Sequence, residues 1–175
     1  EDAIQLCQNH NNRTGLRYLY SLKGKWLIEQ KNYQTALEPL QMALKMANEV
    51  GLSDTSTETL LAIAKLHLGL LEDPQKEAAR LHEETTSIDL AELWYLVGNI
   101  EKSKSVALEA YKWYWADGEP YVNRYYLEQT KALLHRLGVE IPNLPPFDPS
   151  KEVIEDYEIE IDNYIQKLKE EKGKK

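Results

Sequence analysis

The sequence predicts an all-α fold made of antiparallel helical hairpins that stack one after another. Apolar residues recur at intervals of three and four along almost the whole chain of 175 residues, which is the period of an amphipathic helix. No segment of any length shows the alternation of apolar and polar residues that is typical of a strand. The connections between the predicted helices are short, so each helix must fold back on its neighbour.

The apolar period places the helices one by one along the chain. We expect helices over residues 3–8, 13–30, 33–50, 57–71, 74–85, 88–97, 100–116, 120–137 and 149–171. Glycine follows three of these segments, at Gly51, Gly118 and Gly138. Glycine adopts the left-handed conformation that ends a helix without the steric penalty of a Cβ atom, so these positions support the predicted ends.

Proline marks three of the predicted helix starts. Pro74, Pro120 and Pro149 stand where a missing backbone N–H costs nothing, in the first turn of a helix. Asp73 and Asp148 precede two of them, and an aspartate in this place accepts a hydrogen bond from the first turn. The sequence therefore predicts N-caps at both aspartates.

The chain divides into three parts. Residues 1–137 hold the helical hairpins, and residues 138–149 form an extended linker because Pro142, Pro145 and Pro146 exclude a helix. Residues 150–175 form an amphipathic helix with a narrow apolar seam that runs from Ile154 to Leu168. A seam of this kind needs a surface to cover, so we expect this helix to pack on the hairpins as a C-terminal cap.

The sequence also contains an internal repeat with a spacing of 67 residues. The stretch that begins at Asn32 has small residues at Ala36 and Ala43, and the stretch that begins at Asn99 has them at Ser103 and Ala110. Small side chains at these two points allow a pair of helices to approach closely.

The first copy of the repeat resembles the tetratricopeptide repeat (TPR) family. The resemblance rests on Tyr20, Gly24, Leu27, Tyr33, Ala36, Leu40 and Ala43, which reproduce the large and small positions of that family. It implies a TPR-like solenoid over residues 1–137. The aromatic stretch 113–126 and the segment that follows residue 136 also look like the C-terminal repeat region of a bacterial signalling ATPase.

The TPR resemblance also implies where a partner would bind, because the first helices of successive repeats line a concave groove. Carried over to this chain, it places Tyr18, Ser21, Lys25 and Ile28 of the first repeat, and Ile88, Glu92 and Tyr95 of the third, on the groove side. We therefore predict a binding surface there for a protein or peptide.

The aromatic stretch 111–126 suggests both core packing and a second contact surface. Tyr111, Tyr114 and Trp115 share one helical face, and we expect that face to pack in the core. Trp113 points away from it, and Trp113 with Arg124 is the part that we expect to face a partner, because Trp and Arg are frequent hot-spot residues.

Composition and motifs bear on the class of function. The formal net charge of −8 argues against a nucleic-acid partner. The single cysteine, Cys7, suits a reducing compartment, and no apolar run reaches the length of a membrane span, so we expect a cytoplasmic protein without a membrane contact. No initiating Met is present, and we expect a piece of a longer chain.

The sequence offers no grouping that predicts catalysis. It has no glycine-rich phosphate loop, no nucleophile with a positioned base, and no set of four zinc ligands, so we expect neither an enzyme, a cofactor nor a metal site. The predicted function is a non-enzymatic, protein- or peptide-binding module, a sensor or docking segment of a larger bacterial regulatory protein. One alternative is a small-molecule sensor in which Trp113, Trp115, Asp117 and Arg124 form a pocket against the C-terminal segment. Another is structural packing within a parent protein, and the oligomeric state stays open.

Overall fold

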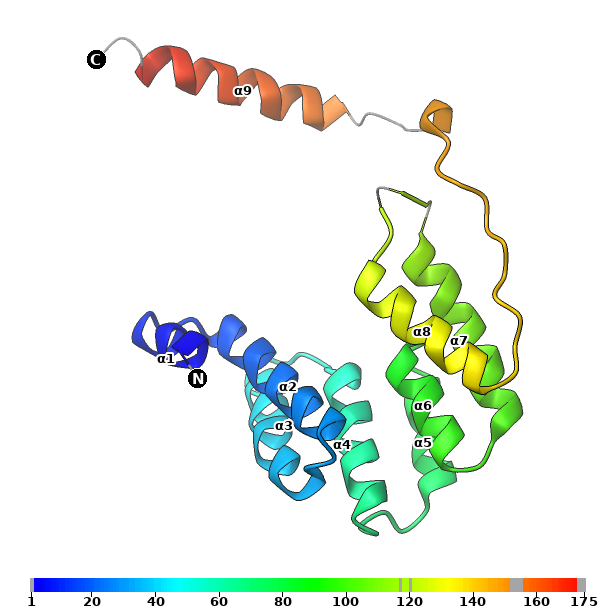
Figure 1. Cartoon of the computed structure of the whole chain (residues 1–175). Coiled ribbons are helices and arrows are strands. Elements are labelled where there is room, and N and C mark those ends of the chain that lie inside the picture. Colours follow the sequence, from blue (N-terminus) through cyan, green and yellow to red (C-terminus); the bar gives the residue numbers. More distant parts are fainter. Residues whose placement is uncertain (1, 117, 120, 152–155, 173–175) are drawn as a thin grey trace.

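Helices account for all the regular structure in the described part of the chain. The computed structural model describes residues 2–116, 118–119, 121–151 and 156–172, and no strand occurs among them (Figure 1). In chain order the elements are α1 (Asp2–Asn9), α2 (Arg13–Glu29), α3 (Tyr33–Asn48), α4 (Thr55–His67), α5 (Pro74–His82), α6 (Ile88–Leu96), α7 (Ile100–Trp115), α8 (Arg124–Arg136), a short 3-10 turn η1 (Pro149–Lys151) and α9 (Asp156–Lys172). The predicted all-α class is confirmed.

Two of the predicted helix starts are wrong. The eighth helix begins at Arg124 rather than at residue 120, because the backbone N–H of Asn123 donates to the carbonyl of Tyr114 and holds residues 121–123 in the turn. The last helix begins at Asp156. Asp148 does act as a cap, since its Oδ1 accepts from the N–H of Ser150 at 3.1 Å, but it caps η1 rather than an α-helix.

The turns after α2 and α6 have the same backbone structure. Lys31 and Gly98, which are corresponding residues of the repeat, are both left-handed, with φ of +59° and +82°. The next residue in each turn donates its N–H to a carbonyl five positions back, from Asn32 to Leu27 at 2.8 Å and from Asn99 to Trp94 at 3.0 Å. This bond closes a helix at its C-terminus. The repeat seen in the sequence is thus also a repeat of backbone conformation.

The helices form an arc of antiparallel pairs (Figure 1). Each helix from α1 to α8 packs against the next one in the chain. In addition, α2 contacts α4, α4 contacts α6, and α6 contacts α8, whereas α3, α5 and α7 make no such contacts with one another among the described residues. Because only the even-numbered helices are close to each other, they line the inner side of the arc.

The core contains the small residues that the repeat predicted. Ala36, Ala43, Ser103 and Ala110 are all 0% exposed. Ser103 also donates from Oγ to the carbonyl of Ala91 at 2.8 Å, which ties α7 to α6. These residues occupy matching places, at the close approach of the two helices in the first hairpin and in the third.

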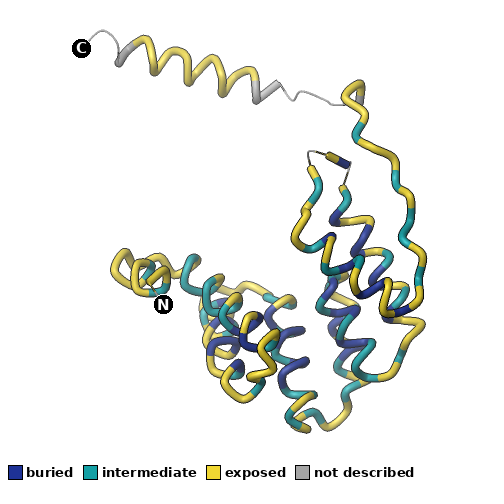
Figure 2. Tube along the Cα trace, in the orientation of Figure 1, coloured by how far each residue is buried: buried dark blue, intermediate teal, exposed yellow. Residues whose placement is uncertain are grey.

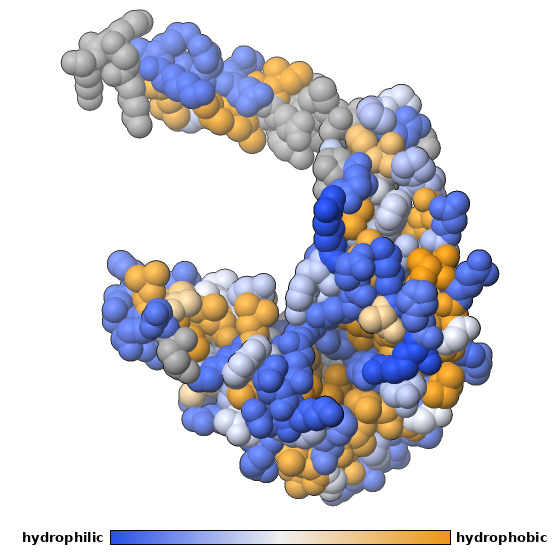
Figure 3. Space-filling view, viewed as in Figure 1, coloured by the Kyte–Doolittle hydropathy of each residue, from blue (hydrophilic) through white to orange (hydrophobic). Residues whose placement is uncertain are grey.

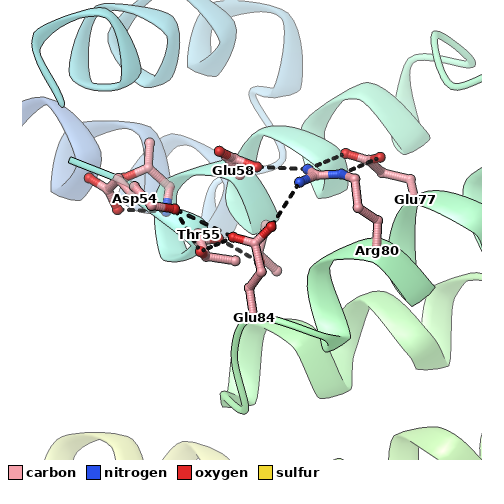
Figure 4. Close-up of polar contacts among 9 residues, drawn as sticks. Asp54, Thr55, Glu58, Glu77, Arg80 and Glu84 are labelled. Carbon is pink, nitrogen blue, oxygen red and sulfur yellow. Dashed lines mark hydrogen bonds and ion pairs between the residues drawn. The ribbon is translucent and has the colours of Figure 1, made fainter. Parts of the chain in front are cut away.

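Surface ion pairs connect α4 to α5. Arg80 of α5 lies 2.7 Å from Glu58 of α4 and 2.9 Å from Glu77 (Figure 4). The hydrogen bonds that Arg80 donates to Glu77 and to Glu58 raise the pKa of its guanidinium, and the bond from Arg80 lowers the pKa of Glu77. Since the Arg80 side chain is 44% exposed, water screens the pairs and they add little to the stability of the hairpin.

The residues that follow α8 behave in two different ways. Residues 139–148 form neither helix nor strand, and Val139, Ile141 and Leu144 pack against the core. The packing predicted for the C-terminal helix is not observed: α9 contacts no other described helix, and its side chains from 159 to 170 are all exposed (Figure 2). None of the described helices is long and apolar enough to cross a bilayer.

Candidate functional site

An ion pair at the middle of the inner side joins the first hairpin to the third. Lys25 of α2 donates from Nζ to both carboxylate oxygens of Asp89 of α6, at 2.9 and 3.0 Å. The Lys25 side chain is 9% exposed and that of Asp89 is 21% exposed. The pair therefore spans α4 and holds α2 and α6 at a fixed separation.

The surroundings keep Lys25 charged despite its burial. Burial by itself lowers the pKa of a lysine, since it disfavours the charged form. The charge of Asp89 and its hydrogen bonds outweigh burial, and the pKa of Lys25 lies above its ordinary value. Its Nζ also lies 4.9 Å from the centroid of the Tyr126 ring, which adds a cation–π contact with α8. One lysine thus contacts α6 and α8 from α2.

Two tyrosines complete the centre of the site. Tyr126 of α8 stacks on Tyr114 of α7, with 5.1 Å between the ring centroids. The N–H of Ile88, at the start of α6, points to the Tyr114 hydroxyl at 3.5 Å. Burial raises the pKa of both tyrosine hydroxyls, and in Tyr126 the charge of Lys25 opposes this shift. Both hydroxyls are therefore neutral donors and acceptors at neutral pH.

The Lys25–Asp89 pair separates two cavities on the inner side. The first has a volume of about 330 Å³, and many of its lining residues carry polar groups, among them Tyr18, Ser21 and Tyr126. Its cation Arg17 is held at 2.6 Å by Asp54, and the Ser21 hydroxyl is 2.8 Å from that of Thr57. The polar groups of this cavity are thus largely satisfied within the chain.

The second cavity is larger and has an apolar floor. Its volume is about 680 Å³, and Ile28, Leu60, Ile63 and Leu133 are among the apolar residues that line it. They come from α2, α4 and α8, and Ile88 and Leu96 of α6 add to the same floor. A cavity of this size and chemistry suits one or two apolar side chains of a ligand.

Polar side chains form the rim of the second cavity. Glu92 of α6 pairs with Arg136 of α8, and both line the opening. On the other side His67 of α4 stacks on Tyr33 of α3, with ring centroids 4.0 Å apart and an angle of 10° between the planes. The rim therefore presents both charged and aromatic groups around an apolar floor.

Most of the residues that the sequence assigned to the groove lie on the inner side. Tyr18, Ser21 and Lys25 line the first cavity, and Lys25, Ile28 and Glu92 line the second. Tyr95 lines neither; its ring lies under the Arg136 guanidinium at 4.4 Å, beside the rim. These predicted residues thus lie close together on the inner side of the arc, and their role in binding a partner stays a prediction.

Trp113 and Arg124 lie away from this surface. The Trp113 side chain is 76% exposed on α7, as the helical face predicted, and Arg124 pairs with Glu119 at 2.8 Å. Neither lines the two inner cavities. The predicted binding residues thus fall in two separate places.

The aromatic corner packs against its own chain. Tyr111 and Tyr114 are 3% and 9% exposed, so the face predicted to be core is buried. Trp115 donates from Nε1 to the carbonyl of Pro145 at 2.9 Å, and the Tyr121 ring meets that of Phe147 edge to face. Residues 139–147 therefore pack against this corner, and Asp117, assigned to the alternative small-molecule pocket, lies outside the described residues.

Sequence reasoning missed three partners of the predicted groove residues: Asp89 and Tyr126, which contact Lys25, and Arg136, which pairs with Glu92. It also missed the Tyr33–His67 stack at the rim. No local pattern connects Lys25 to Asp89, because the pairing depends on how the first and third hairpins are placed. The one available signal was a lysine on the otherwise buried side of α2, next to Gly24.

The site offers contact chemistry. Among the described residues, no group of three or more potential metal ligands gathers. The site offers a ligand an apolar floor and neutral hydroxyls, and its ion pairs are already formed within the chain. Comparisons with protein-family models, curated proteins and solved structures give no match to this chain.

Proposed function

We propose that this chain is a TPR-like helical-repeat module that binds a protein or peptide segment along the inner side of its arc. The observation that carries the proposal is the pair of cavities on either side of Lys25–Asp89, both lined by α2, α4 and α6. The row of contacts among α2, α4, α6 and α8 supports a TPR-like solenoid. The module has no catalytic role and serves as a docking or sensor segment of a larger bacterial regulator in the cytoplasm.

The charges of the groove favour a ligand with apolar side chains over one that offers a free carboxylate. Arg17, Lys25 and Arg136 are each already paired with a carboxylate of this chain. A clamp for a C-terminal carboxylate needs unpaired cations, and these three do not supply them. The floor of the second cavity instead gains free energy when an apolar side chain leaves water.

The proposed mechanism is preorganisation. Lys25 fixes α2 against α6 and α8 before any ligand arrives. The groove then loses little conformational entropy on binding, so that the ordering cost falls mainly on the ligand. A flexible peptide that becomes ordered in the groove fits this mechanism.

The small-molecule alternative at the aromatic corner has less support. The corner residues Trp115, Gly118 and Tyr121 are in contact with the segment 145–147 of the same chain. Structural packing within a parent protein stays open as a role for the exposed Trp113.

A blocking substitution in the second cavity tests the proposal. Ala132 of α8 is exposed and lines this cavity, so that Ala132→Arg places a long side chain in it while the core stays intact. Ser105 of α7 is also exposed and lines neither cavity, which makes Ser105→Arg a matched control for charge and size. Peptides are selected on the wild-type chain from a random displayed library and measured by calorimetry.

We expect the selected peptides to carry apolar anchors and to lose about tenfold or more in affinity on Ala132→Arg, with no change on Ser105→Arg. Thermal unfolding of both variants checks that the fold is retained. If the selected peptides bind Ala132→Arg as tightly as the wild type, the second cavity is not the binding site.

A further inference from the structure

One face of α2 carries an apolar ridge that no described helix covers, and its first two residues also line the first inner cavity. Tyr18, Leu22 and Trp26 stand four residues apart, and so lie in one row along the helix. They are 60%, 38% and 57% exposed. A row of three large apolar side chains at this exposure is unusual for a surface that faces only water.

Comparison of the three repeats shows that the place of Trp26 is normally covered by a helix. The left-handed residues Lys31, Gly69 and Gly98 end α2, α4 and α6 and align the three helices. Counted back five positions from each, Trp26 corresponds to Ala64 and to Leu93. Ala64 and Leu93 are both 0% exposed, against 57% for Trp26.

The preceding hairpin is what covers those two positions. Ala64 belongs to one core cluster with Leu27 and Leu40 of the first hairpin, and Leu93 to a cluster that includes Leu81 of the second. Before α2 the only described helix is α1, which contacts α2 as α3 contacts α4. The ridge thus lies at the end of the row formed by α2, α4, α6 and α8, where one more helix would cover it.

The chain itself contains a helix with a matching apolar stripe. Ile161, Tyr164, Ile165 and Leu168 of α9 follow the spacing of three and four, and each is more than 40% exposed. Figure 3 shows apolar side chains along one side of α9 and hydrophilic ones beside them. Both α2 and α9 have 17 residues, so the two stripes have similar lengths.

The charges of the two helices are opposite. Helix α2 contains four cations (Arg13, Arg17, Lys23, Lys25) and one anion (Glu29), a net charge of +3. Helix α9 contains six Asp and Glu residues and three lysines, a net charge of −3. Arg13, Arg17 and Lys25 are already paired with Glu49, Asp54 and Asp89, so this difference of charge contributes only a weak long-range attraction.

We propose that α9 of a second copy of this chain docks on the ridge of Tyr18, Leu22 and Trp26. Within one chain α9 lies apart from the other helices, and a reciprocal exchange between two copies covers both ridges and both stripes in a closed, two-fold dimer. The inference goes beyond the proposed function, although the ridge adjoins the groove: Tyr18 and Leu22 also line the first inner cavity, whereas Trp26 lines neither cavity.

Sedimentation equilibrium of the full chain over a range of concentrations tests the dimer. We expect a reversible monomer–dimer equilibrium that Trp26→Ala weakens by about thirtyfold, the effect of losing a hot-spot tryptophan. Ile165→Asp on α9 should weaken it as strongly. The controls are Trp113→Ala, which removes an even more exposed tryptophan from α7, and Gln166→Asp on the opposite face of α9. Unchanged association of Trp26→Ala overturns the proposal, as does a chain that is monomeric at every concentration.

Disulfide trapping identifies the occupant of the ridge. In a Cys7→Ser background, Leu22→Cys in one copy and Ile165→Cys in a differently tagged copy should form a mixed covalent dimer on oxidation. A chain that carries both Leu22→Cys and Ile165→Cys should form cross-links between chains, and the yield of these cross-links should rise with protein concentration. A cross-link that forms within single chains at high dilution overturns the proposal, because the occupant is then the chain's own α9. Ala132→Arg should leave the dimer unchanged, which separates this test from that of the peptide groove.

Discussion

Lys25 holds Asp89 through both carboxylate oxygens, at 2.9 and 3.0 Å, across 64 residues of the chain. The two residues belong to the first and third hairpins, and the side chains are 9% and 21% exposed. The pair lies between the two inner cavities, so that the same contact supports the arc and shapes the groove.

Removal of one partner should destabilise the fold strongly. Lys25→Met leaves the Asp89 carboxylate without its cation in a place with little water, and we expect a loss of about 2 to 4 kcal/mol in the free energy of unfolding. Urea unfolding followed by circular dichroism measures this loss. The double variant Lys25→Met/Asp89→Leu should recover much of it, because no unpaired charge remains. A single variant within about 0.5 kcal/mol of the wild type would contradict the structural role of the pair.

Lys25 and the two tyrosines beside it, Tyr114 and Tyr126, should make the stability of the fold sensitive to alkaline pH. The pKa of Lys25 in the folded state lies above the ordinary value of 10.5, so the stability it contributes is complete below that value and is lost as the pH rises through the folded pKa. The raised pKa values of Tyr114 and Tyr126 act in the same direction above pH 10. Urea midpoints should be constant between pH 7 and about 9 and fall above pH 10, with a smaller fall in Tyr126→Phe. If the urea midpoint of Tyr126→Phe falls above pH 10 as much as that of the wild type, Tyr126 does not contribute to the pH dependence.

Gly24 and Leu40 form a second pair whose sizes depend on each other. A Cβ on Gly24 would lie 2.4 Å from Cγ and Cδ2 of Leu40, and Leu40 is 0% exposed, so it has little room to move. Gly24→Ala should therefore destabilise the chain by about 1 to 3 kcal/mol, although the same change in an open helix stabilises it. Urea unfolding measures this loss. The control is Thr14→Ala, a substitution at an exposed site on the same helix.

The third hairpin shows how this conflict can be relieved. Its corresponding residues are Ala91 and Ala107, both 0% exposed. In a Leu40→Ala background, Gly24→Ala should cost far less than in the wild type, with a coupling of about 1 kcal/mol or more in a double-mutant cycle. Independent, additive effects of the two substitutions would show that the two sites do not share this space.

The sequence predicted what depends on neighbouring residues and missed what depends on distant ones. The periodic apolar residues and the caps placed the helices, because both effects act within a few residues. The buried Ala36 and Ser103 followed from the repeat. Asp89 as the partner of Lys25, and the turn at 121–123 that delays α8, arise from contacts between segments far apart or across a corner. The apolar seam of α9 was visible in the sequence, but a seam does not specify which surface covers it.

A single substitution in the first turn of the repeat should stabilise the protein. Lys31 is left-handed at φ +59°, where the third hairpin has Gly98 at +82°. A residue with a Cβ is strained in this region by about 1 to 2 kcal/mol, and Lys31→Gly relieves that strain. The greater entropy of glycine in the unfolded chain offsets part of the relief, so Lys31→Gly should raise the free energy of unfolding by about 0.5 to 1 kcal/mol. Lys31→Ala removes the same side chain but keeps the strain, and should therefore give no gain in the same urea measurement. Gly98→Ala should destabilise by a similar amount, since a Cβ there meets no other atom and only the backbone conformation is at issue. Equal stability of Lys31→Gly and Lys31→Ala would mean that the left-handed conformation carries no strain at this turn.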